Sequence, residues 1–507
     1  MPTAIAHSAS ILGVDAHLVE VEADVSIGLG AFNIVGLPDG AIRESKDRIT
    51  AAINNCGAGF PIRKVVVNLA PADLQKSGTG FDLPMAMAIL EASEQVPQGA
   101  LAQCLLIGEL SLEGRLRPVN GVLAMALAAR NKGFQSIILP PENAASAALV
   151  QGIRLYPASD LLQVLDHFNG RRPLALHVPQ VVETWGFEEP DFSEVKGQLA
   201  AKRALEIAAA GRHNVLFSGP PGAGKSMLAK RLASILPPMS FEECLEATKI
   251  HSIAGRLPYG EERLKRRPFQ SPHHSVSTAG LIGGGSIPRP GEVSLAHHGV
   301  LFLDELPEYQ RAILDSLRQP LEDKKVTISR AKESLTFPTD FVLIAAMNPC
   351  PCGYLGDQRK ACSCSMAMIE RYRAKISGPL MDRIDLQVEM PALTYDEMNF
   401  QKPGEASPAI RGRVIQARTR QTQRFANTTR YNAGMSHKEV ESHCSLTPEG
   451  HRLLAQALDR FKLSGRAHDS IRKVARTIAD LAGEVQIQPG HLAEAIGYRC
   501  LEREIHL

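Results

Sequence analysis

The most informative stretch of the chain is Asn214-Val215-Leu216-Phe217-Ser218, followed directly by Gly219-Pro220-Pro221-Gly222-Ala223-Gly224-Lys225-Ser226. The first stretch predicts a short buried strand, and a helical pattern follows the second until Pro237-Pro238 ends it. A strand, a glycine-rich loop and a helix in this order form a phosphate-binding P-loop. Its glycines let backbone N–H groups turn toward phosphates, and the helix N-terminus favours an anion. We expect Lys225 to reach the β- and γ-phosphates and Ser226 to bind Mg²⁺.

Two further apolar stretches supply groups for hydrolysis. Residues 300–303 predict a buried strand that ends in Asp304-Glu305, and residues 341–346 predict another strand shortly before Asn348. An aspartate at such a strand end can hold Mg²⁺, and the adjacent glutamate can orient or deprotonate the attacking water. We expect Asn348 to contact the γ-phosphate or position water. Parallel strands of an open α/β sheet bring such groups to one edge.

The composition sets broad limits on the protein class. A chain of 507 residues is too long for one ordinary core, and its 44% hydrophobic and 22% charged residues are typical of a globular protein. No stretch approaches the length of a membrane helix, and the start lacks a signal-peptide pattern. The net charge of +2 indicates no particular partner. We expect a cytoplasmic, multidomain α/β protein with no membrane association.

Four blocks follow from the pattern along the chain. Residues 1–170 alternate β-rich runs, such as 64–69, with apolar helical runs, such as 83–91. A polar stretch over 171–191, which contains Trp185, predicts a linker. Residues 192–395 carry the phosphate chemistry. Residues 396–507 predict a helical lid, entered through the Pro- and Gly-containing segment 401–408 and including a helix stopped by Gly483.

A cysteine-rich insert occupies residues 350–364. Cys350-Pro351-Cys352 and Cys362-Ser363-Cys364 provide four thiols in two close pairs. Four soft ligands suit tetrahedral Zn²⁺ in a closed structural site, although the C-x-C spacing is tighter than the usual C-x-x-C. Free reduced thiols and a redox switch are the alternatives. Because the insert follows Asn348 directly, ordering it could stiffen the hydrolysis site.

The order of these motifs resembles the magnesium-chelatase and MCM-like branch of AAA+ ATPases. The resemblance rests on the P-loop, on residues 299–305, on Asn348 and on Ser377-Gly378-Pro379-Leu380-Met381-Asp382-Arg383-Ile384-Asp385. It implies that Arg383 is an arginine finger acting on the neighbour's nucleotide, and that Arg466 in Ser464-Gly465-Arg466-Ala467 is the second sensor arginine. Alternatively, Arg383 pairs with Asp382 or Asp385 at the surface. A finger acting in trans implies a ring, which the resemblance makes a homo-hexamer.

The first block is similar to the Lon-type proteolytic fold. The matching stretches begin at Lys76-Ser77-Gly78-Thr79-Gly80 and at Gly108-Glu109-Leu110 and extend to Val122-Leu123. A Lon protease needs a serine nucleophile and a lysine base. Gly80 and Leu123 stand at the matching positions and can do neither task, and we expect Lys76 to be solvated. The block is therefore expected to be a non-proteolytic Lon-like module for assembly or DNA binding.

Basic segments indicate a nucleic-acid substrate. Residues 323–337 predict a β-hairpin whose basic tip, by the family resemblance, contacts DNA phosphates through Arg330 and Lys332. Residues 271–285 resemble the insert that forms a second pore loop. Residues 406–438 contain seven basic residues and no acidic one, which favours salt-sensitive phosphate binding. A solvated surface is the alternative for the hairpin.

Taken over the whole chain, the sequence resembles the ComM/YifB family. That resemblance implies a hexameric ATPase, dependent on ATP and Mg²⁺, that acts as a helicase on single-stranded, forked or branched DNA. It also implies branch migration during homologous recombination and natural transformation, with recombinase-pathway partners. The alternatives are a magnesium-chelatase motor subunit and a protein-remodelling ring, both acting on a partner protein.

Overall fold

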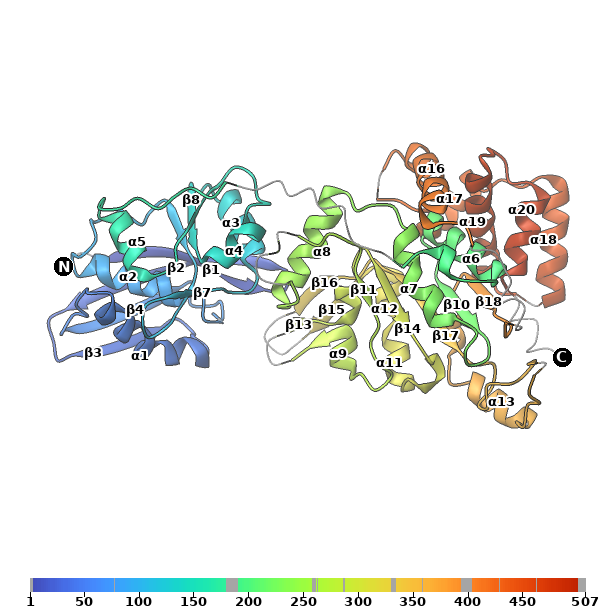
Figure 1. The fold of residues 1–507 in the computed structure, drawn as a ribbon, viewed down its shortest axis with the longest axis horizontal. Helices are drawn as coiled ribbons and strands as arrows, with labels where there is room; N and C mark the ends of the chain where they lie inside the picture. Colours follow the sequence, from blue (N-terminus) through green and yellow to red (C-terminus); the bar gives the residue numbers. More distant parts are fainter. Residues whose placement is uncertain are drawn as a thin grey trace. The chain divides into compact units, whose positions relative to one another are not determined.

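A computed structural model describes most of the chain as two compact units (Figure 1). The first unit comprises Met1–Thr184 and Phe241–Lys265, and the second comprises Trp185–Ser240 and Arg266–Leu507. The described residues are 3–76, 78–178, 190–257, 261, 263–285, 288–329, 334–357, 359–393, 404–427, 429–461 and 463–499. The predicted linker at 171–191, with Trp185, thus lies mostly outside the described residues, as does the segment 396–403.

The first unit is built on a mixed sheet. Within the described residues its seven strands have the order β3-β4-β2-β1-β5-β8-β9, and β2 pairs antiparallel with both β1 and β4. The strands are β1 (Ala4–Leu12), β2 (Asp15–Ser26), β3 (Ala31–Val35), β4 (Lys64–Ala70), β5 (Cys104–Leu106), β8 (Ser136–Leu139) and β9 (Arg154–Pro157), with the small pair β6 (Glu109–Leu110) and β7 (Leu116–Arg117). The helices are α1 (Gly40–Asn55), α2 (Asp82–Ala92), α3 (Val122–Asn131), α4 (Pro141–Ala147) and α5 (Leu161–Phe168).

Helix α2 forms the centre of this unit. All of its residues are buried, including Asp82, whose carboxylate accepts hydrogen bonds from Arg48 at 3.0 Å and from the backbone N–H of Leu110 at 3.2 Å. A helix that is apolar on every side belongs in a core, and the sequence 83–91 predicted one there. The strand predicted at 64–69 is likewise confirmed as β4.

Helix α8 (Phe241–Ile253) packs with the first unit although its sequence follows the P-loop. Lys249 Nζ lies 2.6 Å from the Asp15 carboxylate, and Ser252 Oγ accepts the N–H of Gly121 at 3.2 Å. Sequence analysis did not predict this excursion, because it placed residues 241–265 within the block 192–395.

The second unit contains a parallel sheet. In the described part of the chain its five strands have the order β11-β14-β17-β10-β18, with every pair parallel. They are β11 (Phe269–Gln270), β14 (Val300–Leu303), β17 (Val342–Met347), β10 (Val215–Ser218) and β18 (Leu386–Glu389). The three strands predicted around the nucleotide motifs are confirmed as β10, β14 and β17. They become the interior of the sheet because each is apolar along its whole length.

Helices and two small hairpins surround this sheet. The hairpins are β12 (Gly283–Gly284) with β13 (Arg289–Pro290), and β15 (Lys325–Ser329) with β16 (Ser334–Pro338). The second pair confirms the hairpin predicted at 323–337. The α-helices here are α6 (Leu199–Gly211), α7 (Lys225–Ile235), α9 (Thr278–Ile282), α10 (Glu292–Leu295), α11 (Arg311–Ser316), α12 (Arg318–Asp323), α13 (Met366–Arg373) and α14 (Gly378–Met381), and 3₁₀ turns cover Phe192–Glu194 and Leu306–Glu308.

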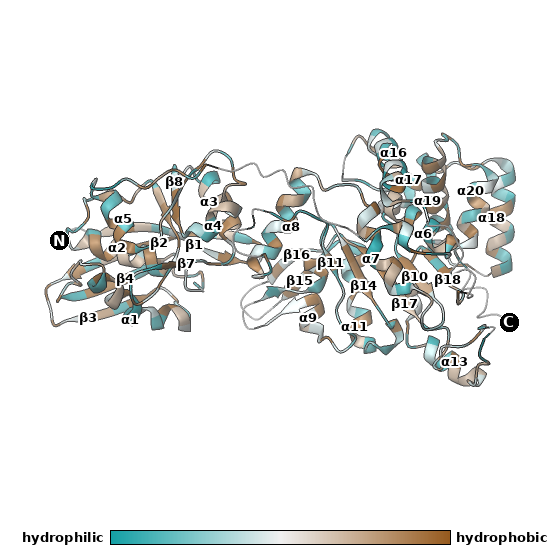
Figure 2. Ribbon diagram, in the orientation of Figure 1, coloured by the Kyte–Doolittle hydropathy of each residue, from teal (hydrophilic) through white to brown (hydrophobic). Residues whose placement is uncertain are grey.

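The C-terminal part of the second unit is helical, as predicted. It contains α16 (Ser407–Phe425), α17 (His437–His443), α18 (Pro448–Phe461), α19 (Gly465–Ala482) and α20 (Pro489–Gly497), with a 3₁₀ turn at Asn432–Gly434. Gly483 caps α19 in the left-handed conformation, at φ 81°, where a residue without Cβ is favoured. The five α-helices form the lid, and Figure 2 shows hydrophobic and hydrophilic stretches alternating along α18.

Lid and α/β core share one apolar cluster. Buried side chains of α6, β10 and β17 belong to the same cluster as those of α16 and α19. A buried polar contact adds to it, because His213 Nδ1 lies 3.0 Å from Asp385 and its Nε2 lies 2.8 Å from Thr477 Oγ1 on α19. The lid is therefore held firmly to the core of its own chain.

One expectation about the first unit is wrong. Lys76, expected to be solvated, is fully buried, and its ammonium donates to the backbone carbonyl of Pro71. Burial lowers the pKa of this lysine, because the low-dielectric interior disfavours the charged form. The neighbouring Ser77 lies outside the described residues. Leu123, which the sequence resemblance aligns with a protease's lysine, is buried in apolar surroundings.

Candidate nucleotide-binding and hydrolysis site

The P-loop connects buried strand β10 with helix α7. Gly222 and Gly224 have φ values of 79° and 88°, which L-residues with side chains rarely adopt. A Cβ on Gly219 would lie 2.3 Å from the carbonyl oxygen of Met390, so the loop start also requires glycine. The remaining loop residues are Pro220, Pro221 and Ala223, followed by Lys225 and Ser226 at the start of α7. The loop thus has the shape that phosphate binding requires.

Lys225 points back across the loop. Its Nζ donates to the carbonyl oxygens of Gly219 at 2.6 Å and Pro220 at 3.0 Å, and to Asn348 Oδ1 at 3.1 Å. Burial lowers the pKa of Lys225, and the charges of Asp304 and Glu305 partly oppose that shift. The structure therefore brings the predicted phosphate-binding lysine and the predicted sensor Asn348 together.

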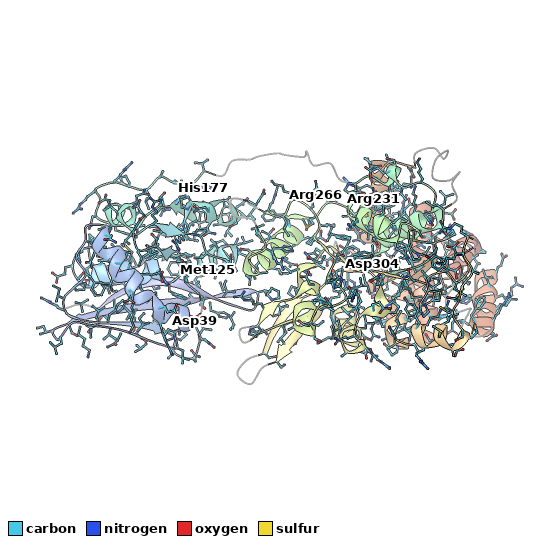
Figure 3. All side chains as sticks on the ribbon, turned by 60° about the horizontal axis from the view of Figure 1, so that its bottom comes forward. Asp39, Met125, His177, Arg231, Arg266 and Asp304 are labelled. Atoms are coloured by element: carbon cyan, nitrogen blue, oxygen red, sulfur yellow. The ribbon has the colours of Figure 1, made fainter. Side chains whose placement is uncertain are left out.

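The magnesium ligands predicted from the sequence also meet. Ser226 Oγ donates to Asp304 Oδ2 at 2.6 Å, and Figure 3 shows Asp304 within the second unit. A hydroxyl and a carboxylate oxygen in contact are the hard donors that Mg²⁺ prefers, so this pair fits the ion. These two residues would hold Mg²⁺ between the P-loop and the end of β14.

Glu305 directly follows the predicted Mg²⁺ ligand Asp304 and is exposed to solvent. Its backbone has φ 52°, an uncommon value for a glutamate, and its side chain is 57% exposed. His274 Nδ1 lies 3.5 Å from one of its carboxylate oxygens. An exposed carboxylate beside the Mg²⁺ ligands is free to contact a water molecule. Sequence reasoning missed His274, although it lies in the segment interpreted as a second pore loop.

The two predicted arginines share one carboxylate. Arg383 and Arg466 both pair with Glu322 at the end of α12, Arg466 at 2.8 Å. Arg383 also donates to the carbonyl of Pro379 at 2.5 Å, and neither Asp382 nor Asp385 is its ion-pair partner among the described contacts. The structure thus places the arginine-finger and second-sensor candidates next to each other. Glu322 was missed because it lies in an ordinary-looking charged helix end.

The four cysteines of the insert converge on one point. Their Sγ atoms all lie within 4.8 Å of one another, and the Cys350–Cys352, Cys350–Cys362 and Cys352–Cys362 pairs are 3.4, 3.7 and 3.6 Å apart. Cys364 completes the set. All four are free thiols. The sequence-predicted ligand set is therefore assembled in space, as a metal site requires.

The predicted DNA contacts at the hairpin tip, Arg330 and Lys332, lie outside the described residues. The hairpin strands β15 and β16 that lead to them are described and pair from Lys325↔Pro338 to Ser329↔Ser334. Thr327 and Thr336 face each other across the pair with their hydroxyls 3.1 Å apart.

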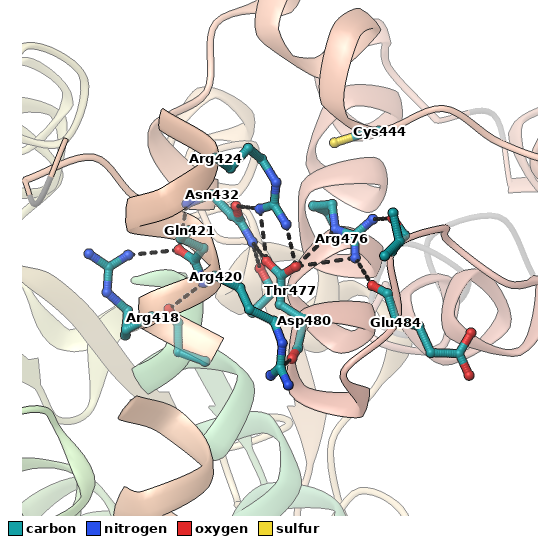
Figure 4. Close-up of polar contacts among 12 residues, drawn as sticks. Arg418, Arg420, Gln421, Arg424, Asn432, Cys444, Arg476, Thr477, Asp480 and Glu484 are labelled. Atoms are coloured by element: carbon teal, nitrogen blue, oxygen red, sulfur yellow. Dashed lines mark hydrogen bonds and ion pairs between the residues drawn. The ribbon is translucent and has the colours of Figure 1, made fainter. Parts of the chain in front are cut away.

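The arginines of the basic lid segment, interpreted from the sequence as a phosphate-binding face, make contacts within their own unit. Figure 4 shows that Arg424 pairs with the buried Asp480, and that Arg476 of α19 reaches the same carboxylate. The other arginines of the segment also contact groups inside the unit. Arg413 pairs with Glu206 and Glu405, and Arg430 pairs with Glu439. Hydrogen bonds run from Arg411 to the Ser234 carbonyl, from Arg418 to the Gln421 side chain and from Arg420 to the Asp480 carbonyl. Carboxylates pair with Arg413, Arg424 and Arg430, whereas these hydrogen bonds of Arg411, Arg418 and Arg420 are to neutral carbonyl or amide oxygens.

Comparison with known proteins covers nearly the whole chain. A family model described as "Magnesium chelatase, subunit ChlI" matches residues 191–398, "Subunit ChlI of Mg-chelatase" matches 21–143, and "Magnesium chelatase, subunit ChlI C-terminal" matches 404–499. Competence protein ComM of Haemophilus influenzae is 44% identical over 99% of this chain and 98% of its own length. Protein YifB of Escherichia coli is 41% identical over 100% and 99%. Lon protease 2 of Bacillus subtilis is 31% identical over 28% of this chain.

Proposed function

Because this chain belongs to the ComM/YifB family of magnesium-chelatase-like AAA+ ATPases, we propose that it is an ATP-driven ring motor that moves on DNA. In this proposal the active form is a homo-hexamer that promotes branch migration during homologous recombination and natural transformation. Its DNA substrates are single-stranded, forked or branched. The Haemophilus relative is a competence protein, which supports this pathway.

The observation that carries the proposal is the hairpin between the two hydrolysis strands. β15 and β16 lie in sequence between β14, which Asp304 follows directly, and β17, which ends before Asn348. The hairpin follows β14 after α11 and α12 and leads directly into β17, so it lies between the two strands that deliver catalytic groups. Its tip carries Arg330 and Lys332 in the sequence, and positive groups there suit phosphate contacts without base recognition. Nucleotide-dependent movement of the strand ends would move the tip.

The chain's own residues divide the work of hydrolysis. Lys225 exchanges its contacts with loop carbonyls for the β- and γ-phosphates, and Asn348, already bonded to Lys225, positions the γ-phosphate or water. Glu305 takes the proton of the attacking water. Ser226 and Asp304 would hold Mg²⁺, which would supply positive charge to the phosphates when bound. After leaving Glu322, Arg383 supplies positive charge to the neighbour's nucleotide, and Arg466 acts as the second sensor arginine.

The cofactors in this proposal are ATP and Mg²⁺ at the P-loop and a structural Zn²⁺ in the cysteine insert. The partners are DNA, five further copies of the chain and proteins of the recombinase pathway. No helix in the described part of the chain combines the length and apolar character needed to cross a bilayer. We place the activity in the cytoplasm, where ATP is available and thiols stay reduced.

A branch-migration assay tests the proposal. A fluorescently labelled three-strand junction is incubated with protein, ATP and Mg²⁺, and strand exchange is followed on gels. We expect ATP-dependent conversion by the natural chain and none by Glu305→Gln, which keeps the P-loop intact. Absence of conversion and of DNA binding, in protein that is hexameric with ATP, would instead favour a motor that acts on a partner protein.

A further inference from the structure

The loop between β17 and α13 is held together by sulfur rather than by an apolar core. Among the described residues from Pro351 to Ser365, only Gly353 is buried. A loop this long without secondary structure of its own needs another source of order, or it has a function. Its cysteines are the residues that meet: Cys350 is fully buried and its Sγ lies 3.4 and 3.7 Å from those of Cys352 and Cys362.

These distances fit a tetrahedral metal. Four sulfurs bound at about 2.3 Å from one Zn²⁺ would be separated by roughly 3.8 Å, close to the observed 3.4–3.7 Å. A disulfide would instead bring one pair to about 2.05 Å and leave the other two unrelated. The backbone N–H of Cys364 also donates to Cys362 Sγ at 3.4 Å, a contact that stabilises a thiolate ligand.

The same loop touches the nucleotide site. Gly353 has φ 84°, its N–H donates to the carbonyl of Cys350 at 3.0 Å, and a Cβ there would lie 2.9 Å from Pro221 of the P-loop. The same added atom would be 3.9 Å from Asn348 Cγ. Asn348 in turn accepts a hydrogen bond from Lys225. A short chain of contacts therefore runs from the cysteines through Gly353 to the phosphate-binding lysine.

We infer that one Zn²⁺ bound by Cys350, Cys352, Cys362 and Cys364 braces the nucleotide site by holding Gly353 against Pro221 and Asn348. This inference rests on the proposed ATPase function but not on the DNA substrate. Binding replaces the four thiol protons with one dication, so the occupied site carries a net charge of −2 and its assembly releases four protons. A closed four-thiolate site leaves no position for substrate, so the metal supports structure and performs no chemistry itself.

Metal content is measured first on the whole protein, purified without chelator. Atomic emission should give about one zinc per chain, and Cys362→Ser should abolish it. Cys56→Ser is the control, because Cys56 is a free thiol of the first unit outside the cluster. If zinc is absent from the natural chain and ZnCl₂ is not taken up, or if Cys362→Ser binds zinc equally well, the metal site is wrong.

The brace is tested separately in a Glu305→Gln background with a fluorescent ATP analogue and no DNA. Releasing zinc with a mercurial and a chelator should weaken analogue binding about tenfold. We expect this magnitude because Lys225 would lose roughly one charge-assisted hydrogen bond to the nucleotide. Thiol reduction followed by ZnCl₂ should restore it. Gly353→Ala should retain zinc and still weaken binding, because its Cβ displaces Pro221.

Equal analogue affinity in the zinc-bound, zinc-free and Gly353→Ala proteins would overturn the brace while leaving the metal site intact. Failure of the DNA-motor proposal would show only in DNA assays, because neither zinc content nor analogue binding involves DNA. The two failures are thus distinguishable.

Discussion

Replacing Arg424 by alanine separates a structural lid arginine from a DNA-binding one. Arg424 donates to Asp480 Oδ2 at 2.9 Å and to Asn432 at 3.0 Å, and the Asp480 side chain is only 1% exposed. Breaking a buried ion pair by removing one partner costs about 3–5 kcal/mol. Because Arg476 and Asn432 still contact the carboxylate, we expect a loss of stability at the lower end of this range, about 3 kcal/mol. At about 2–4 °C per kcal/mol, the melting temperature of the second unit should fall by about 6–12 °C.

Two measurements on the same variant decide the question. Differential scanning fluorimetry with ATP present should show the lower melting temperature, whereas Lys438→Ala, at an exposed lid position, should leave it unchanged. Fluorescence anisotropy with labelled DNA at several salt concentrations should give the same salt slope for Arg424→Ala and the natural chain. Arg330→Ala should instead reduce the slope by about 0.7–0.9, the value for one phosphate contact. An unchanged melting temperature together with a reduced salt slope for Arg424→Ala would refute this reasoning.

Three further predictions concern catalysis and the lid. Glu305→Gln should retain ATP binding but hydrolyse about 100- to 10,000-fold more slowly in a steady-state assay, and a natural rate would exclude Glu305 as the base. Mixing Arg383→Ala with Glu305→Gln chains should recover part of the ATPase activity if Arg383 acts in trans; no recovery at any ratio argues for action within one chain. Burial raises the pKa of Asp385, but the opposing effect of its hydrogen bonds, above all the one from His213, is larger. The pKa of Asp385 is therefore about 2, below the usual 3.8. This carboxylate should therefore stabilise the fold above about pH 4 and lose that contribution as pH falls toward 2, so His213→Ala should shift acid unfolding, followed by circular dichroism, to higher pH.

Local sequence signals were sufficient for the elements that carry the nucleotide motifs. Strand β14 has the predicted bounds, and α7 ends beside the predicted Pro237-Pro238 stop. Each of these features depends on the apolar pattern and on helix-breaking residues within a few positions. The contact of Ser226 with Asp304 followed from the same reasoning, because both stand at the edge where parallel strands end.

Features that depend on distant segments could not be predicted in this way. Arg413 forms an ion pair with Glu206, which lies in the distant helix α6. Lys76 is buried by residues that a local pattern does not identify. The pairing of Arg383 and Arg466 with Glu322 likewise joins three separate parts of the chain. Counting charges within a segment therefore identified the basic residues but did not show which of them are paired within the chain.

The most direct test of the central claim is the steady-state ATPase rate with and without single-stranded and forked DNA, at low and at higher salt. A motor that tracks the DNA backbone should be strongly stimulated at low salt and less so as salt rises, because counterion release drives its binding. Glu305→Gln should show no stimulated turnover while still binding the DNA. An equal rate with and without DNA, from protein shown to be hexameric with ATP, would contradict the account and point to a partner protein as the substrate.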